Sequence, residues 1–203
     1  MAHIPDGVLS VPVLAGGFVV AGGLVAVSLR RLDERTIPRA AILSAAFFVT
    51  SLVAVPVGPS SVHLLLSGLM GLMIGRLAAP AVLVGLLLQA VLFGFGGLTT
   101  LGVNTANIAL PGILFGALFA PAVLRAEAGR AGLLAGICAA LSVAGTGLLV
   151  ALALALSSSD YVPSARILLV TYLPLMAGEA LITGFAVSFL KRVKPDALAG
   201  VAP

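Results

Sequence analysis

The sequence predicts an all-α polytopic membrane protein, with about seven transmembrane helices in a single transmembrane domain over residues 1–203. Of the residues, 61% are hydrophobic and 9% are charged, whereas soluble domains are typically about 45–50% apolar and about 25% charged. Several apolar runs approach the roughly 20 residues that a helix needs to cross a hydrocarbon core of about 30 Å. These observations exclude a soluble domain. Because the basic residues lie scattered between the apolar runs, the formal charge of +4 fits membrane topology rather than nucleic-acid binding.

Each predicted span is bounded by charged residues or by a polar segment. The first follows the polar MAHIPDG and ends before two arginines, and the second ends as VGPSSVH begins. The third is short and is separated from the fourth by Arg76 alone, and the fourth ends before LTTLGVNTAN. Arg125 and Arg130 separate the fifth from the sixth, and Arg166 and Lys191 flank the seventh. In chain order the predicted spans are Val11–Leu29, Ala40–Val57, Val62–Gly75, Leu77–Gly97, Ile108–Leu124, Ala131–Leu156 and Ile167–Leu190.

The basic residues predict the orientation, because cytoplasmic loops carry an excess of Lys and Arg. With the N-terminus outside and the C-terminus in the cytoplasm, ten of the eleven basic residues lie on the cytoplasmic side and only Arg166 lies outside. The ten are Arg30, Arg31, Arg35, Arg39, Arg76, Arg125, Arg130, Lys191, Arg192 and Lys194. We therefore expect a multi-pass protein of the cell (inner) membrane. No Lys or Arg precedes the first apolar run, so we expect no cleavable signal peptide.

Two connections on the predicted outer side are polar but carry no formal charge. They are VGPSSVH (57–63) and LTTLGVNTAN (98–107). Polar segments near membrane depth must be satisfied by protein or line a cavity, because lipid offers no hydrogen bonds. We expect structured segments packed over an outer site; ordinary exterior loops are the alternative.

Few polar side chains lie within the predicted spans. Glu179 in PLMAGEALIT is a functional candidate, because a carboxylate at membrane depth is costly unless it is paired or protonated. A proton relay and a structural hydrogen bond between helices both remain open for it. Gln89, Asn104 and Asn107 are more typical of hydrogen bonds between helices than of ligands. The single cysteine, Cys138, allows no intramolecular disulfide.

Motifs of known enzymes are missing from the sequence. It has no G-x-S-x-G elbow, no H-E-x-x-H zinc motif and no Walker A lysine pattern. An intramembrane enzyme that uses Glu179, or Ser61 with His63, remains a weaker alternative. We expect no enzymatic activity of the chain itself.

The two histidines, His3 and His63, are both predicted on the outer side. A terminal amine, a backbone amide that loses its proton and an imidazole Nδ1 can bind one metal ion in a plane. Ni²⁺ and Cu²⁺ favour such square-planar nitrogen sites, and imidazole also suits cobalt. His63 could supply a further nitrogen. Binding would release protons from these groups, so the affinity should fall as the pH drops.

The identity of the amine depends on Met1. Because Ala2 is small, we consider removal of Met1, after which the Ala2 amine, the His3 amide and imidazole and His63 supply four nitrogens. If Met1 is retained, Met-Ala-His offers four nitrogens by itself, and His63 is axial or unused.

Four segments resemble the CbiM/NikM family of substrate-capturing membrane subunits, which serve energy-coupling factor (ECF) transporters for cobalt and nickel. They are MAHIPDGVLS, SSVHLLLSGLMGLMIG (60–75), GGLTTLGVNTANIALPG (96–112) and LPLMAGEALITGFAVSFL (173–190). The resemblance covers essentially the whole chain. The H-I-P-D-G segment and the glycine-, threonine- and asparagine-rich run are its specific parts.

The resemblance implies an ECF S-component-like bundle with an additional N-terminal helix. It also implies that the extreme N-terminus, residues 1–10, enters the protein to bind the ion. The implied ligands are the Ala2 amine after trimming, His3 and His63, although family members usually begin Met-His, so the extra Ala2 shifts the register of the amine. The implied partners are a membrane coupling (T) subunit, a pair of cytoplasmic ATPases and a small accessory membrane subunit.

On this interpretation Co²⁺ or Ni²⁺ is the transported ligand, and no cofactor is expected. Residues that could orient the metal ligands as an outer shell are Asp6, Ser60, Thr99, Thr100 and Asn104. A carrier for a small organic solute such as a vitamin remains the alternative, and it would need an apolar pocket and no histidine.

Overall fold

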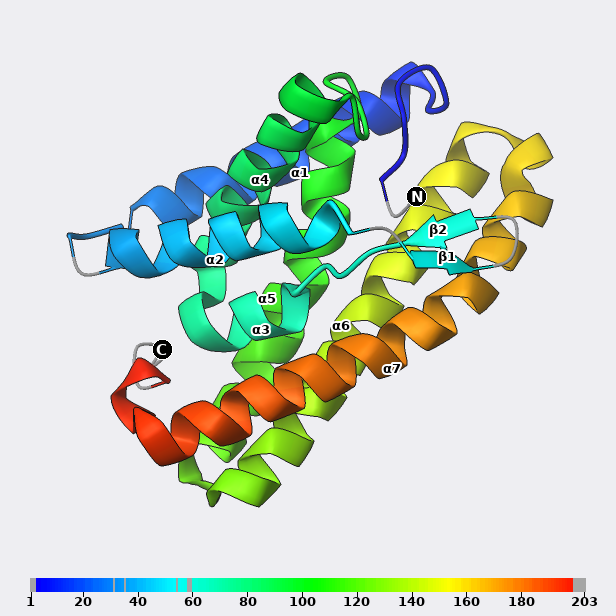
Figure 1. The fold of residues 1–203 in the computed structure, drawn as a ribbon. Helices are drawn as coiled ribbons and strands as arrows, with labels where there is room; N and C mark the ends of the chain where they lie inside the picture. Colours follow the sequence, from blue (N-terminus) through cyan, green and yellow to red (C-terminus); the bar gives the residue numbers. More distant parts are fainter. Residues whose placement is uncertain (1–2, 31, 35, 54, 58–59, 199–203) are drawn as a thin grey trace.

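The computed structural model describes residues 3–30, 32–34, 36–53, 55–57 and 60–198 (Figure 1). These residues form a helical bundle with one short β-hairpin, in which the two strands pair antiparallel with Val55 opposite Val62. The elements in chain order are α1 (Val11–Leu29), α2 (Thr36–Ser51), β1 (Val55–Val57), β2 (Ser60–Val62), α3 (Ser67–Ile74), the 3₁₀ turn η1 (Gly75–Leu77), α4 (Ala78–Phe93), α5 (Leu101–Arg125), α6 (Ala128–Ser157), η2 (Ser159–Tyr161), α7 (Val162–Val193) and η3 (Pro195–Ala197).

The helices confirm a polytopic membrane protein but not a count of about seven spans. Within the described residues, five helical stretches are long and apolar enough to cross a bilayer. The predicted third and fourth spans form one of them, because α3 has only eight residues and continues through η1 into α4. The apolar part of α2, Ile37–Ser51, is shorter than a full span. The five stretches are Val11–Leu29, Ser67–Phe93, Leu101–Arg125, Ala128–Ser157 and Ser159–Val193.

Two predicted boundaries are wrong at positions where polar residues lie inside the protein. The second predicted span continued to Val57, but α2 ends at Ser51 and the chain then enters the hairpin. The fifth was predicted to begin at Ile108, but α5 begins at Leu101 and contains most of the LTTLGVNTAN segment. Asn104, Thr105 and Asn107 are buried in its first turns, so this polar stretch is helical because protein rather than lipid surrounds it.

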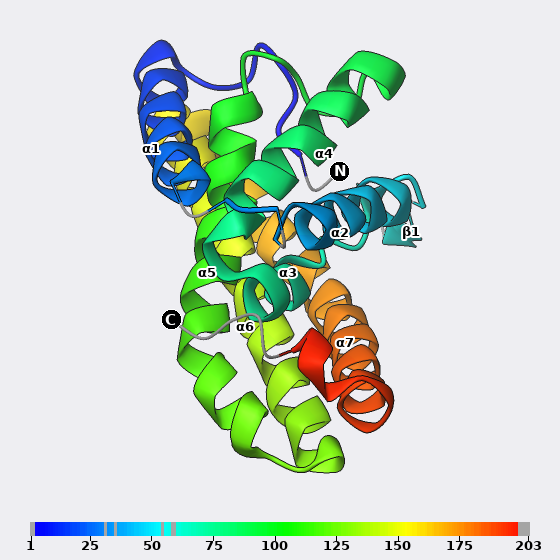
Figure 2. The same cartoon turned by 90° about the vertical axis from the view of Figure 1, so that its left-hand side faces the viewer.

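Helix α5 runs through the centre of the bundle and packs against α1, α3, α4 and α6 (Figures 1 and 2). Helix α7 lies along α6, and α2 lies against α4. The main apolar core is buried among these helices, with Phe47, Met70 and Val143 fully enclosed. A smaller cluster under the N-terminal segment contains Ile4, Leu9 and Val103. This arrangement places the N-terminal segment and the start of α5 at one end of the bundle, and the α5–α6 turn at the other (Figure 2).

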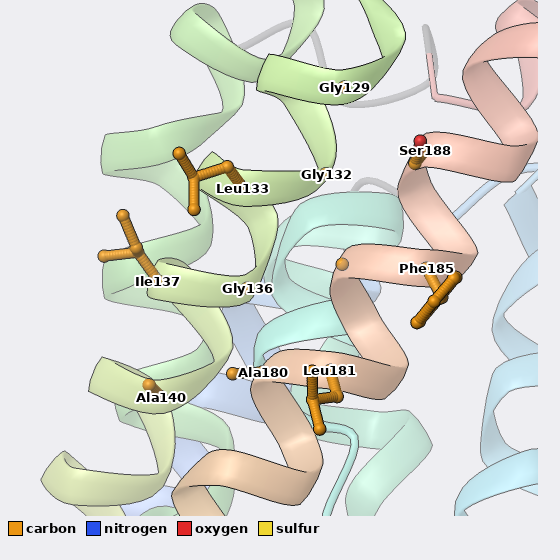
Figure 3. Close-up of a pocket in the computed structure, with 11 residues that line it drawn as sticks. Gly129, Gly132, Leu133, Gly136, Ile137, Ala140, Ala180, Leu181, Phe185 and Ser188 are labelled. Atoms are coloured by element: carbon orange, nitrogen blue, oxygen red, sulfur yellow. The ribbon is translucent and has the colours of Figure 1, made fainter.

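Glycines bring helix backbones into direct contact at two interfaces. Between α6 and α7, a Cβ on Gly132 would lie 2.7 Å from the carbonyl oxygen of Gly184, and one on Gly136 would lie 2.8 Å from that of Ala180. Figure 3 shows the resulting groove, with Leu133 and Ile137 on its α6 side and Leu181 and Phe185 on its α7 side. Small residues of this kind allow close approach of helices in a bilayer.

The contact between α3 and α5 is tighter still. Gly71 lies directly against the backbone of Gly112 and Gly116, so that a Cβ at position 71 would overlap the Gly112 carbonyl group. This contact holds the short helix α3 against α5, and it therefore also helps to position residues 63–66, which lead into α3.

We expect Gly71→Ala to destabilise the protein by about 1–3 kcal/mol, because the added methyl group forces two packed backbones apart. Gly22→Ala on α1 is the matched control, since a Cβ there meets no atom within 4 Å. Thermal unfolding in detergent should show a lower Tm for Gly71→Ala and an unchanged or slightly higher Tm for Gly22→Ala. Equal Tm values for the two variants would contradict close packing at Gly71.

Candidate metal-binding site

The N-terminal segment turns into the protein and is held by the first turn of α5 (Figure 2). The Ile4 backbone N–H donates to Oδ1 of Asn104 at 3.0 Å, and Nδ2 of Asn104 donates to the Ile4 carbonyl oxygen at 3.0 Å. The Thr100 hydroxyl also donates to the Ile4 carbonyl oxygen, at 2.8 Å. The Ile4 side chain is buried in the smaller apolar cluster. The Asn104 side chain therefore bonds both the N–H and the carbonyl oxygen of Ile4, the residue after His3.

Asp6 attaches the same segment to the N-terminus of α5. Its Oδ1 accepts hydrogen bonds from the backbone N–H groups of Thr99 at 3.0 Å and Thr100 at 3.3 Å, and its Oδ2 accepts from that of Leu98 at 3.2 Å. The Thr99 hydroxyl donates to Oδ1 as well, and this bond, assisted by the backbone N–H groups, lowers the pKa of Asp6 below its ordinary value. A carboxylate at a helix N-terminus also interacts favourably with the helix dipole.

The Gly96-Gly97 pair makes room for this docking. Gly96 has φ +77°, and a Cβ there would lie 3.3 Å from Cβ of His3. A Cβ on Gly97 would overlap the Asp6 carboxylate. Gly7, with φ +81°, turns the chain toward α1 in a conformation that favours glycine. Gly96 and Gly97 therefore leave space for His3 and Asp6, and Gly7 allows the turn that follows Asp6.

His63 reaches the site from the segment between β2 and α3. Its exposed fraction is 6%, and its Nδ1–H donates to the Leu64 carbonyl oxygen at 3.0 Å. Because a carbonyl oxygen can only accept, this bond requires the proton on Nδ1 and leaves a lone pair on Nε2. Nε2 is buried and has no hydrogen-bond partner among the described residues. One imidazole nitrogen of His63 is thus free to bind a ligand.

The His3 and His63 rings lie side by side, although 60 residues separate them in the sequence. Their centroids are 4.5 Å apart and their planes are inclined by 40°. His3 is buried, and within the described part of the chain neither of its ring nitrogens has a hydrogen-bond partner. Three imidazole nitrogens of the pair therefore lack a hydrogen-bond partner among the described residues, which is unusual because buried polar groups are nearly always hydrogen-bonded.

Burial keeps both imidazoles neutral. It is the main cause that lowers the pKa of His3 to about 3, and the neighbouring His63 lowers it further. Burial likewise lowers the pKa of His63. Neutral imidazole is the form that binds metal ions, so no proton has to leave either ring at neutral pH. Two neutral imidazoles side by side could supply two nitrogen ligands to a divalent metal ion.

Most predicted site residues meet here. His3, His63, Asp6, Thr99, Thr100 and Asn104 belong to one contact region. Met1 and Ala2 lie outside the described residues, as do the side chains of Ser60 and Ser61 on β2. Among the described residues, no group of three or more His, Cys, Asp and Glu side chains could hold a metal ion. Backbone and terminal nitrogens are further candidate ligands.

Two further residues lie in this region: Gln89, which was predicted to bond between helices, and Glu179, for which a proton relay and a structural hydrogen bond were both left open. Gln89 is fully buried, its Nε2 donates to the Ser51 hydroxyl at 2.6 Å, and its side chain interacts with the His3 imidazole and opposes the lowering of the His3 pKa. Glu179 accepts hydrogen bonds from the Leu65 and Leu66 N–H groups, two and three residues after His63. The signal in the sequence was an amide or a carboxyl side chain within an otherwise largely apolar run.

Comparison with known proteins gives several full-length matches. A putative metal transport protein of Haemophilus influenzae is 37% identical over 198 residues, covering 97% of this chain and 96% of that protein. The cobalt transport protein CbiM of Sorangium cellulosum is 33% identical, with 97% and 94% covered. The fused nickel transport protein NikMN of Rhodobacter capsulatus is 30% identical over 97% of this chain, which spans 64% of that longer protein.

The fold is shared with a solved protein described as a transition metal transporter. The two superpose with a TM-score of 0.81 at 24% identity, over 98% of this chain and 96% of the other. The family model for the cobalt uptake substrate-specific transmembrane region, CbiM, matches residues 3–197, from His3 almost to the end of the chain. This protein therefore belongs to the CbiM family, whose members are membrane components of cobalt and nickel transport rather than enzymes.

Proposed function

We propose that this multi-pass membrane protein is the substrate-capturing subunit of an ECF-type importer of Co²⁺ or Ni²⁺. We further propose that His3 and His63 bind the ion. The observation that carries the proposal is the pair of buried, neutral imidazoles, three of whose ring nitrogens have no hydrogen-bond partner in the part of the chain that the structure describes. A buried polar nitrogen without a partner is costly, and a bound metal ion would remove that cost.

The remaining ligands of the proposed site are nitrogens of the N-terminal backbone. The terminal amine and the backbone amide of His3 can join the imidazole in a square plane, the geometry that Ni²⁺ favours. The amine belongs to Ala2 if Met1 is removed and to Met1 if it is retained. The contacts of Ile4 and Asp6 support this arrangement, because they fix the backbone directly after His3.

The proposed orientation has the site on the outer side and the C-terminus in the cytoplasm. Basic residues collect at the bundle end opposite the N-terminal segment, where Lys191 Nζ donates to the Leu124 carbonyl oxygen at 2.6 Å (Figure 2). Arg125 and Arg130 flank the α5–α6 turn at the same end. This distribution supports a cytoplasmic position for that end.

The proposed partners are a membrane coupling subunit, a pair of cytoplasmic ATPases and a small accessory membrane subunit. The sequence itself carries no Walker A lysine pattern, so energy for import would come from such partners. Membership of the CbiM family supports this division of labour.

Replacing either histidine tests the proposed ligands directly. We expect His3→Ala and His63→Ala each to lower the affinity for Ni²⁺ and Co²⁺ by at least about 100-fold, more than the roughly 10–100-fold typical of changes around a metal ligand. The control is Cys138→Ala, which removes a buried thiol that belongs to no cluster of metal-binding side chains. Titration calorimetry on purified protein measures the affinities. Unchanged binding by both histidine variants would refute the site.

Extending the N-terminus tests the amine. A Gly-Ser extension before Met1 displaces the amine from the site, so binding should be lost although both imidazoles remain. The same extension after Pro203 is the matched control and should leave binding unchanged. Intact-mass spectrometry of the unextended protein identifies whether Met1 or Ala2 carries the amine. Equal affinity of the two extended proteins would show that the amine is not a ligand.

Asp6→Ala tests whether docking of the N-terminal segment supports binding. Loss of the carboxylate removes the contacts with Leu98, Thr99 and Thr100, so we expect the Ni²⁺ affinity to fall by about 10–100-fold with both histidines intact. Asp160→Ala, at an exposed carboxylate of η2, is the control and should bind as the unmodified protein does. Equal effects of the two substitutions would exclude a specific role for Asp6.

A further inference from the structure

The position of His63 depends on a short segment that has no regular secondary structure of its own. Residues 63–66 connect β2 to α3, and all but Leu64 are buried. Leu66, at the N-cap of α3, has φ 49° and ψ 18°, a left-handed conformation that residues with a Cβ rarely adopt. Such a conformation persists only where surrounding contacts hold it.

Glu179 supplies those contacts from α7. Its side chain is fully buried, and Oε1 accepts hydrogen bonds from the backbone N–H groups of Leu65 and, at 2.8 Å, Leu66. No side chain of α3 or of its N-cap residue caps the start of the helix. The N–H groups there have no partner within the helix, so they require an outside acceptor. A carboxylate oxygen meets this requirement, because it can accept hydrogen bonds from two N–H groups at once.

The support behind Glu179 is rigid. Helix α7 packs against α6 through Gly132, Gly136, Ala180 and Gly184, where the two backbones are in contact (Figure 3). Ala180 is the residue next to Glu179, so the carboxylate projects from the most closely packed part of α7. The acceptor is therefore fixed in space independently of the segment that it holds.

We propose that Glu179 is a positioning residue for metal capture, which holds the His63 segment so that the His63 imidazole lies beside that of His3. This inference rests on the proposed role of His63 as a ligand. Glu179 acts through the Leu65 and Leu66 backbone and is not itself a ligand, since it forms no metal-binding cluster with other described side chains. Asp6 makes the same kind of contact at the start of α5 for the segment that carries His3. In each case one carboxylate accepts hydrogen bonds from backbone N–H groups at the start of a helix and so holds a histidine segment in place.

Three substitutions at position 179 test separately the length of the side chain, the presence of a hydrogen-bond acceptor and the negative charge. Glu179→Ala removes the acceptor, Glu179→Asp keeps the charge but shortens the side chain by one methylene group, and Glu179→Gln keeps an oxygen acceptor at full length. Thr183→Val is the matched control, because Thr183 is fully buried one turn along α7 and its hydroxyl has no hydrogen-bond partner among the described residues. Each variant is titrated with Ni²⁺, and its Tm is measured without metal.

We expect Glu179→Ala and Glu179→Asp to lower the Ni²⁺ affinity by about 10–100-fold, as is typical for residues that orient metal ligands. The d–d absorption band of bound Ni²⁺ should shift in both variants toward that of His63→Ala, because His63 would no longer be held in reach of the ion. Glu179→Gln should stay within a few-fold of the unmodified protein and keep its spectrum, and Thr183→Val should match the unmodified protein in both respects.

Three results would overturn the proposal. They are an unchanged spectrum and affinity in Glu179→Asp, a loss in Glu179→Gln as large as that in Glu179→Ala, and a loss in Thr183→Val equal to that in Glu179→Ala. Glu179→Asp decides the question even if Glu179→Ala fails to fold, since it retains the carboxylate. Failure of the proposed function is a different result, in which His3→Ala and His63→Ala bind Ni²⁺ as the unmodified protein does.

Discussion

The docking of the N-terminal segment onto the first turn of α5 is the interaction on which the rest of the site depends. A helix N-terminus inside a membrane protein presents N–H groups that neither lipid nor the helix itself can satisfy. At the start of α5 the Asp6 carboxylate accepts from the N–H groups of Leu98, Thr99 and the N-cap residue Thr100, and Asn104 bonds the Ile4 backbone one turn further along. These hydrogen bonds at the start of α5 hold the N-terminal segment, and with it His3, inside the protein.

The same requirement recurs at α3, where the acceptor comes from a distant helix. Glu179 lies more than 100 residues from Leu65 and Leu66, yet its carboxylate meets both of their N–H groups. Close packing at Gly71 fixes α3 against α5, and α5 also carries the residues that hold the N-terminal segment. Both histidine segments are therefore positioned by contacts with α5. These contacts explain how two rings that are 60 residues apart in the sequence have centroids only 4.5 Å apart.

Hydropathy predicted the lipid-facing helices well and the polar interior poorly. The first predicted span coincides with α1, Val11–Leu29, and the sixth differs from α6 by at most three residues at either end. The start of α5 was missed by seven residues, because Asn104, Thr105 and Asn107 resemble a loop when only the sequence is considered. Asn104 bonds the Ile4 backbone, 100 residues earlier in the sequence, and no local window contains that segment. The sequence also predicted two spans, separated by Arg76, where the structure has one helical stretch. The chain forms a 3₁₀ turn around Arg76 and continues from α3 into α4, so Arg76 does not mark a membrane boundary.

The sequence by itself determined the membrane class and the family resemblance, and it singled out His3 and His63 as candidate ligands. Composition and apolar runs are local properties, and two histidines in 203 residues leave few alternatives. Only the tertiary structure decided that the two imidazoles face each other with unpartnered nitrogens, that Asp6 fastens one segment and that Glu179 fastens the other. The physical reason is that each of these contacts joins residues roughly 60 to 115 positions apart. The contacts of Asp6 and Glu179 are also hydrogen bonds to backbone groups, which every sequence has and which no motif records.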